Sequence, residues 1–422
     1  MYQTLELFPG VTLRCIRDRR FKQGALSIQF LRPMRREESA LNALLPAVLL
    51  RGCESCPDLK QITHRLDDLY GASVGTLVRR IGDYQTTGFY CGFMEDRFAL
   101  GNDRILAPMV AFVGELLLQP VLQDGKFHPE YVESEKRNLI AAIESQRSDK
   151  RAYAAGRLLE LMCQEDSFGI PRLGEIPQVQ AIDPENLHCH YRKILEESPL
   201  EIFYVGAADA QTVAEAVAPI FRKLPRNLLS LPQQTPYHVS PSREETEVME
   251  VAQGKLSLGF YTPITNQDPR FAAMQMCNAI FGSGMTSKLF MQVREKLSLC
   301  YAIGSSYYGS KGILTVNAGI DSHQEPAARQ AILSQLAACQ QGDITESELL
   351  SARESILSSL RAVCDSPGAM EAFFGVSALS GLDRDLEEYA RQIRAVTAED
   401  VVAAAKTIVL HSSFFLKGEV HE

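Results

Sequence analysis

Gly24-Ala-Leu-Ser-Ile-Gln-Phe30 decides the fold, because a similar segment, Gly254-Lys-Leu-Ser-Leu-Gly-Phe260, follows it 230 residues later. The same offset relates Gly52 to Gly282, and each of these glycines follows an apolar, helix-like run. Repetition at a constant offset is typical of a duplicated domain. We therefore expect one domain that is used twice.

Further matches extend the repeat over most of the chain. Tyr70-Gly71-Ala72 falls on Cys300-Tyr301-Ala302 at the same offset. At a slightly smaller offset, Ala181 to Leu187 matches Ala395 to Val401. The stretch from Arg226 to Arg243, which contains three prolines and follows a fourth, separates the copies. We predict domains at 1–225 and 244–422, joined by a linker at 226–243.

Composition limits the classes of protein that fit. A chain of 422 residues is too long for one compact core and fits two domains. Its content of 45% hydrophobic and 23% charged residues is ordinary for a globular protein. A net charge of -9 gives no electrostatic reason to bind nucleic acid or an anionic membrane. The start lacks a secretory signal, and the apolar run from Ala40 to Leu50 is too short to span a bilayer. With ten scattered cysteines, we expect reduced thiols in a cytoplasm.

Strand and helix patterns alternate in the same order in both copies. In the segment Gly24 to Phe30, apolar residues alternate with Ser27 and Gln29, which predicts a strand with one buried and one solvated face. Helix signals follow, including Asp183-Pro184 in the first copy and Thr397-Ala-Glu-Asp400 in the second. The expected fold is α+β, two tandem domains that each have a mainly antiparallel sheet with helices packed on one face.

Metal and nucleotide motifs are weak. If His188-Cys189-His190 is helical, its two histidines lie about 200° apart around the axis and cannot share one ion, so we expect a solvated helix face. Cys53-Glu-Ser-Cys56 has no second cysteine pair with which to make a zinc ribbon. Gly282-Ser-Gly-Met-Thr-Ser-Lys288 lacks the spacing of a phosphate loop.

Arg294 and Tyr301 are stronger candidates for a role in binding. The first falls near the end of a predicted helix from Lys288 to Leu297, and the second begins the next predicted strand. A guanidinium and a phenol can both donate hydrogen bonds to a carbonyl oxygen. The alternative from spacing alone is a salt bridge and a packed ring.

The segment from Gly282 to Ala302 resembles a motif of the pitrilysin/insulinase zinc peptidases, the family of mitochondrial processing peptidase, and the duplicated plan resembles it too. This resemblance implies a His-x-x-Glu-His helix in the first copy and a Glu ligand on a later helix. Here Ala43 and Ala47 occupy the histidine positions, Pro46 the Glu position, and Ala142 the position of the later ligand. None of these side chains can bind zinc or activate water, so the expected metal and cofactor content is none.

Arg294 and Tyr301 match the family's Arg/Tyr pair that contacts substrate, and the chain is similar in particular to the zinc-free, YmfF-like subunits. The resemblance implies a pseudoenzyme that is active only as a heterodimer with a relative bearing His-x-x-Glu-His, the two holding an extended peptide between them. The alternative is a homodimeric structural or peptide-binding protein without a catalytic partner. A peptidase with unrecognised ligands such as His188 is the remaining possibility.

Overall fold

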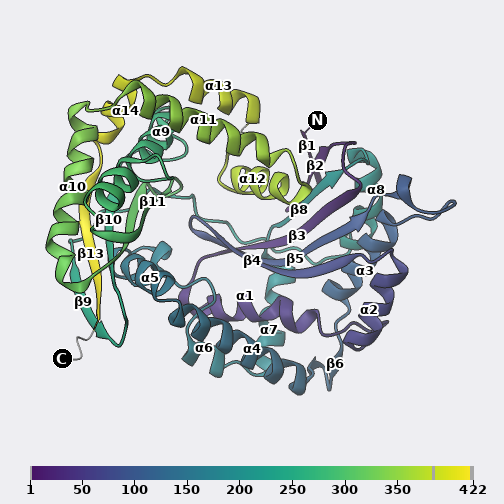
Figure 1. Ribbon diagram of the computed structural model, residues 1–422. Coiled ribbons are helices and arrows are strands. Elements are labelled where there is room, and N and C mark those ends of the chain that lie inside the picture. The colour runs from purple at the N-terminus through teal and green to yellow at the C-terminus, as the bar shows by residue number, and fades with distance from the viewer. Residues whose placement is uncertain (1, 383–384, 419–422) are drawn as a thin grey trace. The chain divides into compact units, whose positions relative to one another are not determined.

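A computed structural model describes residues 2–382 and 385–418 of the chain (Figure 1). The chain divides into two compact units, and each unit takes segments from both halves of the sequence. Unit 1 consists of Met1–Ile143, Ile170–Gln233 and Val363–Leu379. Unit 2 consists of Glu144–Gly169, Gln234–Ala362 and Ser380–Glu422. The segment 226–243 has no regular secondary structure.

The sheet of unit 1 is mainly antiparallel, with one parallel pair. Six strands among the described residues form it in the order β1-β2-β8-β3-β5-β4. Their bounds are β1 Tyr2–Phe8, β2 Val11–Arg17, β3 Gln23–Pro33, β4 Ser73–Ile81, β5 Tyr84–Met94 and β8 Leu200–Gly206. Only β2 and β8 run parallel among these described strands.

The sheet of unit 2 repeats this topology. Five of the described strands form it in the order β11-β12-β10-β13-β9. They are β9 Glu244–Met249, β10 Gly254–Tyr261, β11 Cys300–Tyr308, β12 Ile313–Ile320 and β13 Val409–Gly418. Here β9 and β13 make the parallel pair, as β2 and β8 do in unit 1. The α+β fold with a repeated, mainly antiparallel sheet is therefore confirmed.

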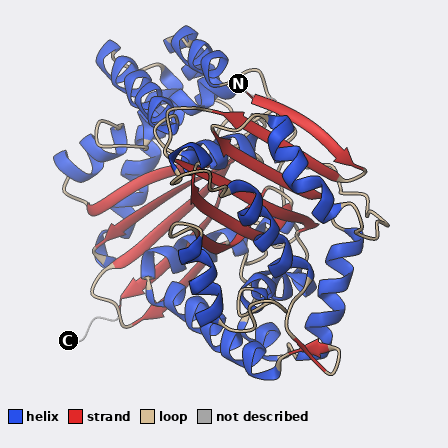
Figure 2. Cartoon of the chain, turned by 90° about the vertical axis from the view of Figure 1, so that its right-hand side faces the viewer, coloured by secondary structure: helices blue, strands red, loops and turns tan. Residues whose placement is uncertain are grey.

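Helices line the sheets of both units (Figure 2). Those of unit 1 are α1 Arg36–Leu49, α2 Leu59–Asp68, α3 Leu106–Leu118, α6 Ile176–Gln180, α7 Pro184–Glu197, α8 Ala210–Phe221 and α12 Pro367–Leu379. Those of unit 2 are α5 Lys150–Met162, α9 Phe271–Phe281, α10 Glu325–Gln341, α13 Leu386–Ala395, α14 Ala398–Ala405 and a π-helix, Leu289–Lys296. Two more, α4 Pro129–Ser148 and α11 Glu346–Val363, cross from one unit to the other. A small hairpin pairs β6 Leu122–Gln123 with β7 Lys126–Phe127.

The two faces of β3 are both buried, which corrects the expectation of a solvated face. Leu26, Ile28 and Phe30 point into the core that includes α1. Successive side chains of a strand alternate between its faces, so Ser27 and Gln29 face the other way. There both hydrogen-bond to Glu371 of α12, which lies across the sheet from α1 (Figure 1). The alternation of apolar and polar residues could not reveal this burial, because the covering helix α12 comes from the second half of the chain.

In unit 2 the equivalent face of the sheet is covered in the same way, by a helix from the other half of the sequence. Helix α5 belongs to the first half of the sequence but packs on β10 and β13. Gly259 of β10 makes room for it, since a Cβ there would lie 2.9 Å from Met162 Sδ. Arg157 of α5 also pairs with Glu245 of β9 at 2.8 Å. Each sheet therefore carries one helix from the other half of the sequence on the face opposite its own helices.

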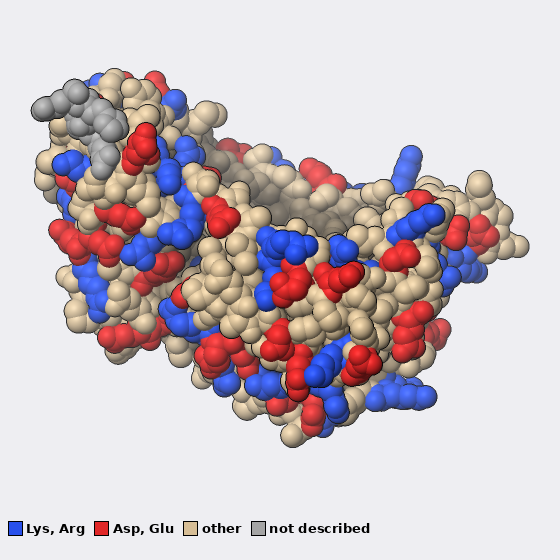
Figure 3. Space-filling view, turned by 90° about the horizontal axis from the view of Figure 1, so that it is seen from below, with Lys and Arg blue, Asp and Glu red and all other residues tan. Residues whose placement is uncertain are grey.

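Lys, Arg, Asp and Glu are interspersed on the face drawn in Figure 3, without a broad region of one sign. In residues 2–382 and 385–418, no helix is both long and apolar enough to cross a bilayer.

Candidate functional site

The positions that correspond to the zinc motif lie on α1 and α4. Ala43 and Pro46 are buried in α1, and Ala47 is partly buried one residue further on. Ala142 is exposed on α4. Three methyl groups and a pyrrolidine ring contain no atom that can bind a metal ion, so these residues do not fit the zinc that the family resemblance implies.

Pro46 lies in the middle of α1, yet the helix continues through it to Leu49. A proline has no N–H, so the carbonyl oxygen of Asn42, four residues earlier, loses its helical partner. The hydroxyl of Thr87 on β5 donates to that oxygen at 2.8 Å, and both groups are buried. The neighbouring strand therefore supplies the hydrogen bond that the helix itself cannot make.

The end of α1 is anchored to α4 by Arg51. Its Nη1 lies 3.2 Å from Glu135 Oε1, and its guanidinium lies 5.1 Å from the centre of the Tyr131 ring. The two helices that carry the degenerate positions are therefore adjacent through these side chains. An open hollow of about 460 Å³ lies beside Arg51 along the start of α4.

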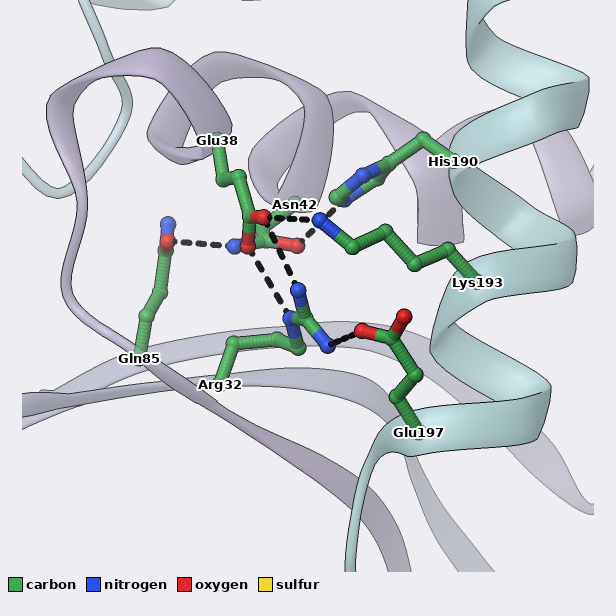
Figure 4. A network of polar contacts seen from close by, with 7 residues as sticks. All are labelled: Arg32, Glu38, Asn42, Gln85, His190, Lys193 and Glu197. Carbon is green, nitrogen blue, oxygen red and sulfur yellow. Dashed lines mark hydrogen bonds and ion pairs between the residues drawn. The ribbon is translucent and has the colours of Figure 1, made fainter. Parts of the chain in front are cut away.

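A buried polar network surrounds the start of α1 (Figure 4). The guanidinium of Arg32 donates to Glu38 through Nε and Nη2, and its Nη1 donates to Glu197 at 3.0 Å. Lys193 Nζ reaches the same Glu38 carboxylate at 2.8 Å. Burial on its own would raise the pKa of Glu38, but hydrogen bonds from Arg32 and Lys193 lower it to about 2. Glu38 is therefore an ionised structural group that holds α1 against β3 and α7.

His190 joins this network, which corrects the expectation of a solvated helix face around residues 188–190. Its Nε2 lies 2.8 Å from Asn42 Oδ1, while Asn42 Nδ2 donates to Gln85 Oε1. Because the Asn42 amide nitrogen is already donating, its oxygen accepts from a His190 Nε2–H. Burial lowers the pKa of His190 to about 4, with a smaller opposing effect from Glu38. The imidazole is thus neutral and structural at pH 7.

The other residues of the 188–190 cluster point elsewhere. The His188 ring lies 5.6 Å from the ring of Phe127 and 6.0 Å from that of Tyr191, and Cys189 is exposed. Burial, followed by the charge of Arg192, lowers the pKa of His188. Over the described ranges 2–382 and 385–418, no three His, Cys, Asp or Glu side chains are grouped in a way that could hold a metal ion.

Arg294 and Tyr301 lie at the β11 edge of the sheet of unit 2. The predicted helix is a π-helix, Leu289–Lys296, with Leu289 and Val293 fully buried. Arg294 lies over the half-buried ring of Phe290, with the guanidinium carbon 4.5 Å from the ring centre. Its side chain is 37% exposed, and its ion pair with the adjacent Glu295 is a long one of 3.5 Å.

Tyr301 is 69% exposed and lies in a β-bulge between Cys300 and Ala302. A bulge locally redirects a side chain relative to the regular pleat. The charge of Arg294 acts on the neighbouring Cys300 thiol, opposing the effect of burial, which raises that pKa to about 11. The structure therefore brings both residues to the same end of β11, with their polar groups available to a ligand.

The nearby glycine-rich turn is structural. Lys288 is buried and pairs with Glu348 of α11 at 2.8 Å, so it does not act as a phosphate-binding lysine would. Gly282 ends α9, and a Cβ there would lie 2.5 Å from Ser305 Oγ on β11. The glycine thereby lets the turn approach the strand that carries Tyr301.

Comparisons with known proteins agree with this geometry. A family model described as "Peptidase M16 inactive domain" matches residues 181–356. The chain is 30% identical over 409 residues to "Probable inactive metalloprotease YmfF" of Bacillus subtilis, an alignment that covers 97% of this chain and 96% of that protein. The chain belongs to the M16 peptidase family. This confirms the pitrilysin/insulinase-type resemblance.

Solved structures share the fold of this M16 chain. A conserved protein from Enterococcus faecalis V583 superposes with a TM-score of 0.91 at 29% identity, covering 100% of this chain and 99% of that one. A structure described as the peptidase M16 inactive domain from Pseudomonas fluorescens superposes with a TM-score of 0.83 at 18% identity, over 100% and 99% of the two chains. The second likeness concerns the fold alone.

Sequence reasoning missed several residues that shape these sites. Thr87 gave no signal, because a threonine in a strand is ordinary. Glu371 did give one: a carboxylate inside the otherwise apolar run Ala369-Met-Glu-Ala-Phe-Phe374 is typical of a buried, paired charge. Its partner Arg79 lies too far away in the sequence to be found without the fold.

Proposed function

We propose that this M16 chain is a zinc-free, non-catalytic subunit of a heterodimeric zinc peptidase, and that it contributes Arg294 and Tyr301 to the binding of an extended peptide. The catalytic His-x-x-Glu-His would come from the partner. The observation that carries the proposal is the contrast between the two copies. Ala43, Pro46 and Ala47 are alkyl groups in a repacked helix, whereas Arg294 and Tyr301 remain accessible.

The edge strand β11 supports a peptide-binding role. Among the described strands, β11 is hydrogen-bonded to β12 on one side only. On its other side the Ser305 N–H donates to the Gly282 carbonyl at 3.0 Å, so an added strand would pair with the part of β11 that precedes Ser305. Tyr301 and Arg294 lie where such a strand would begin. Their phenol and guanidinium donors suit a peptide carbonyl, including one that gains negative charge while the partner's zinc site attacks it.

Peptide cleavage assays with this protein, a zinc-bearing M16 partner and their mixture test the proposal. We expect hydrolysis by the mixture and none by this chain alone. Arg294→Ala in the mixture should lower kcat/KM by about 10- to 100-fold, the equivalent of losing one charge-assisted hydrogen bond. Tyr301→Phe should lower it less. Lys296→Ala is the matched control, since it removes an exposed charge from the same π-helix. Equal activity of Arg294→Ala and this control would refute the assigned role.

Exposed apolar side chains near this site favour a protein contact there. Met285, Met291 and Leu297 are 75%, 47% and 51% exposed around the π-helix. A second copy of the chain could cover them in place of a zinc-bearing partner, which is the homodimeric alternative. Light scattering of the purified chain and of the mixture distinguishes these assemblies. A stable homodimer that no M16 partner dissociates would favour the alternative.

The proposal includes a cytoplasmic location. All ten cysteines lie in the described part of the chain as free thiols, and most of them are buried. Disulfides are rare where cellular reductants keep thiols reduced, and free cysteines fit such a compartment.

A further inference from the structure

We infer that unit 2 contains a carboxylate-binding pocket beside the β11 edge, which selects an acidic group of the peptide that binds there; this inference rests on the proposed peptide-binding role. The cavity has a volume of about 250 Å³. That is far above the ~10–15 Å³ that one water molecule needs. Its walls come from the start of α5 and from strands β10, β11 and β12.

Two cationic side chains line the cavity. Arg151 is exposed at the start of α5, and Lys255 is half-buried on β10. Within residues 2–382 and 385–418, neither forms an ion pair with a carboxylate, and Lys255 Nζ makes a long hydrogen bond of 3.4 Å to Gln253 Oε1. Asp149 lies nearby, but its Oδ1 already accepts from the backbone N–H groups of Arg151 and Ala152. The pocket therefore has more positive charge than its own acidic neighbour offsets.

The electrostatics of Lys255 fit this description. Burial lowers the pKa of its ammonium, and the charge of Arg151 lowers it further, while Asp149 acts in the opposite direction. A bound carboxylate would relieve the repulsion between the two cations. A guanidinium beside an ammonium is a common arrangement for binding such a group.

At the equivalent place in unit 1 lies the Tyr90 side chain, since a Cβ added to Gly368 of α12 would lie 2.8 Å from its hydroxyl. The strand registers show which residues of the two sheets are equivalent. In unit 2, Ser257 pairs with Asn317 and Lys255 with Gly319. In unit 1, the equivalent pairs are Ser27 with Tyr90 and Ala25 with Gly92. The bulky Tyr90 of unit 1 is thus replaced by Asn317, and the apolar Ala25 by the cationic Lys255. Both Asn317 and Lys255 line the cavity.

Helices α5 and α12, which cover the two sheets, differ at equivalent positions as well. Asp149 caps α5, and Ser366 Oγ accepts from the Ala369 N–H at the start of α12. Counting from these caps, Ala154 corresponds to Glu371, and Arg151 corresponds to Gly368. In unit 1 a carboxylate is therefore built into the chain and held by Arg79 at 2.8 Å. In unit 2 the carboxylate is missing, the space is open, and cations line it.

The ligand is assigned by position. Ala302 to Ser306 of β11 form one wall of the cavity, and Tyr301 directly precedes them. A peptide added to this edge would pass the mouth of the pocket. Its acidic side chain or its C-terminal carboxylate could then reach Arg151 and Lys255, while the neutral Ser306 and Asn317 offer further hydrogen bonds.

Fluorescence anisotropy with matched labelled peptides tests the inference. One peptide has an internal Glu and an amidated end, one has Gln and a free carboxylate, and one has Gln and an amidated end. We expect one of the two acidic peptides to bind at least about tenfold more tightly than the neutral one. The double variant Arg151→Gln/Lys255→Gln should bind all three alike. A preference that survives in this variant, or equal affinity of the native chain for all peptides, would overturn the inference.

Two further variants separate this inference from the proposed function. Ala154→Glu supplies the carboxylate that unit 1 contains, and we expect it to abolish the preference for acidic peptides. Arg294→Ala should weaken the neutral and acidic peptides by the same factor. If Arg294→Ala has no effect on any peptide, the proposed function fails. If it weakens all three while acidity makes no difference, only the pocket assignment fails.

Discussion

Replacing Thr87 by Val should reveal how the chain tolerates a proline where the zinc peptidases have a catalytic Glu. Valine has nearly the shape of threonine but lacks the hydroxyl that donates to the Asn42 carbonyl at 2.8 Å. That carbonyl would become a buried acceptor without a donor, because Pro46 has no N–H. An unsatisfied buried group of this kind costs about 1–3 kcal/mol.

The same substitution should cost far less in a Pro46→Ala background. The alanine introduced there has an N–H that can bond to the Asn42 carbonyl in the ordinary helical manner, so Thr87 is no longer its sole donor. We expect Thr87→Val to cost below about 1 kcal/mol in that background, which gives a coupling energy of about 1–2 kcal/mol between positions 46 and 87.

Urea denaturation of the four proteins of this double-mutant cycle measures the coupling as shifts in the free energy of unfolding. Thr87→Ser is the control, since it keeps the hydroxyl and should show little coupling with position 46. Equal costs of Thr87→Val in the native and Pro46→Ala backgrounds would refute the explanation.

Three further outcomes follow from buried groups. The pKa of His190 falls from 6.5 in the unfolded chain to about 4 in the folded one. Its contribution to the free energy of unfolding should therefore decrease by about 3 kcal/mol as pH drops from 6.5 to 4. In His190→Gln, the denaturation midpoint should depend less on pH over this range. Glu371→Ala should lower the free energy of unfolding, measured by urea denaturation, by about 3–5 kcal/mol, because Arg79 loses its carboxylate partner. A decrease below about 1 kcal/mol would contradict this. Gly88→Ala should lower Tm, since its Cβ would lie 1.9 Å from the Ile28 carbonyl oxygen.

The repeat in the sequence predicted the centre of each unit well. Strands β3 and β10, the helix that ends at Gly282, and the capped helix that begins after Asp183 are all present. These elements have strong local signals, namely alternation of apolar residues or a capping side chain. The M16 resemblance of the segment that carries Arg294 was also correct.

Partnerships across the chain could not be predicted in this way. Ser27 and Gln29 have the pattern of a solvated strand face, and only the fold shows that Glu371 covers them. His190 likewise lies on a polar helix segment, and its burial depends on Asn42. A single sequence reports the polarity of a residue, whereas burial depends on which distant element packs against it. The roles of Arg294 and Tyr301 in binding remain a prediction.

The reciprocal exchange of α5 and α12 has a consequence for biosynthesis. The strands of the first sheet leave the ribosome long before α12 does, so the Ser27 and Gln29 face stays bare until most of the second half has been translated. Domains whose segments are all made early can fold during synthesis, whereas unit 1 stays incomplete until α12 has been made. A nascent chain paused at the 226–243 segment should therefore be a substrate for chaperones, and neither half should be obtainable as a stable fragment by itself.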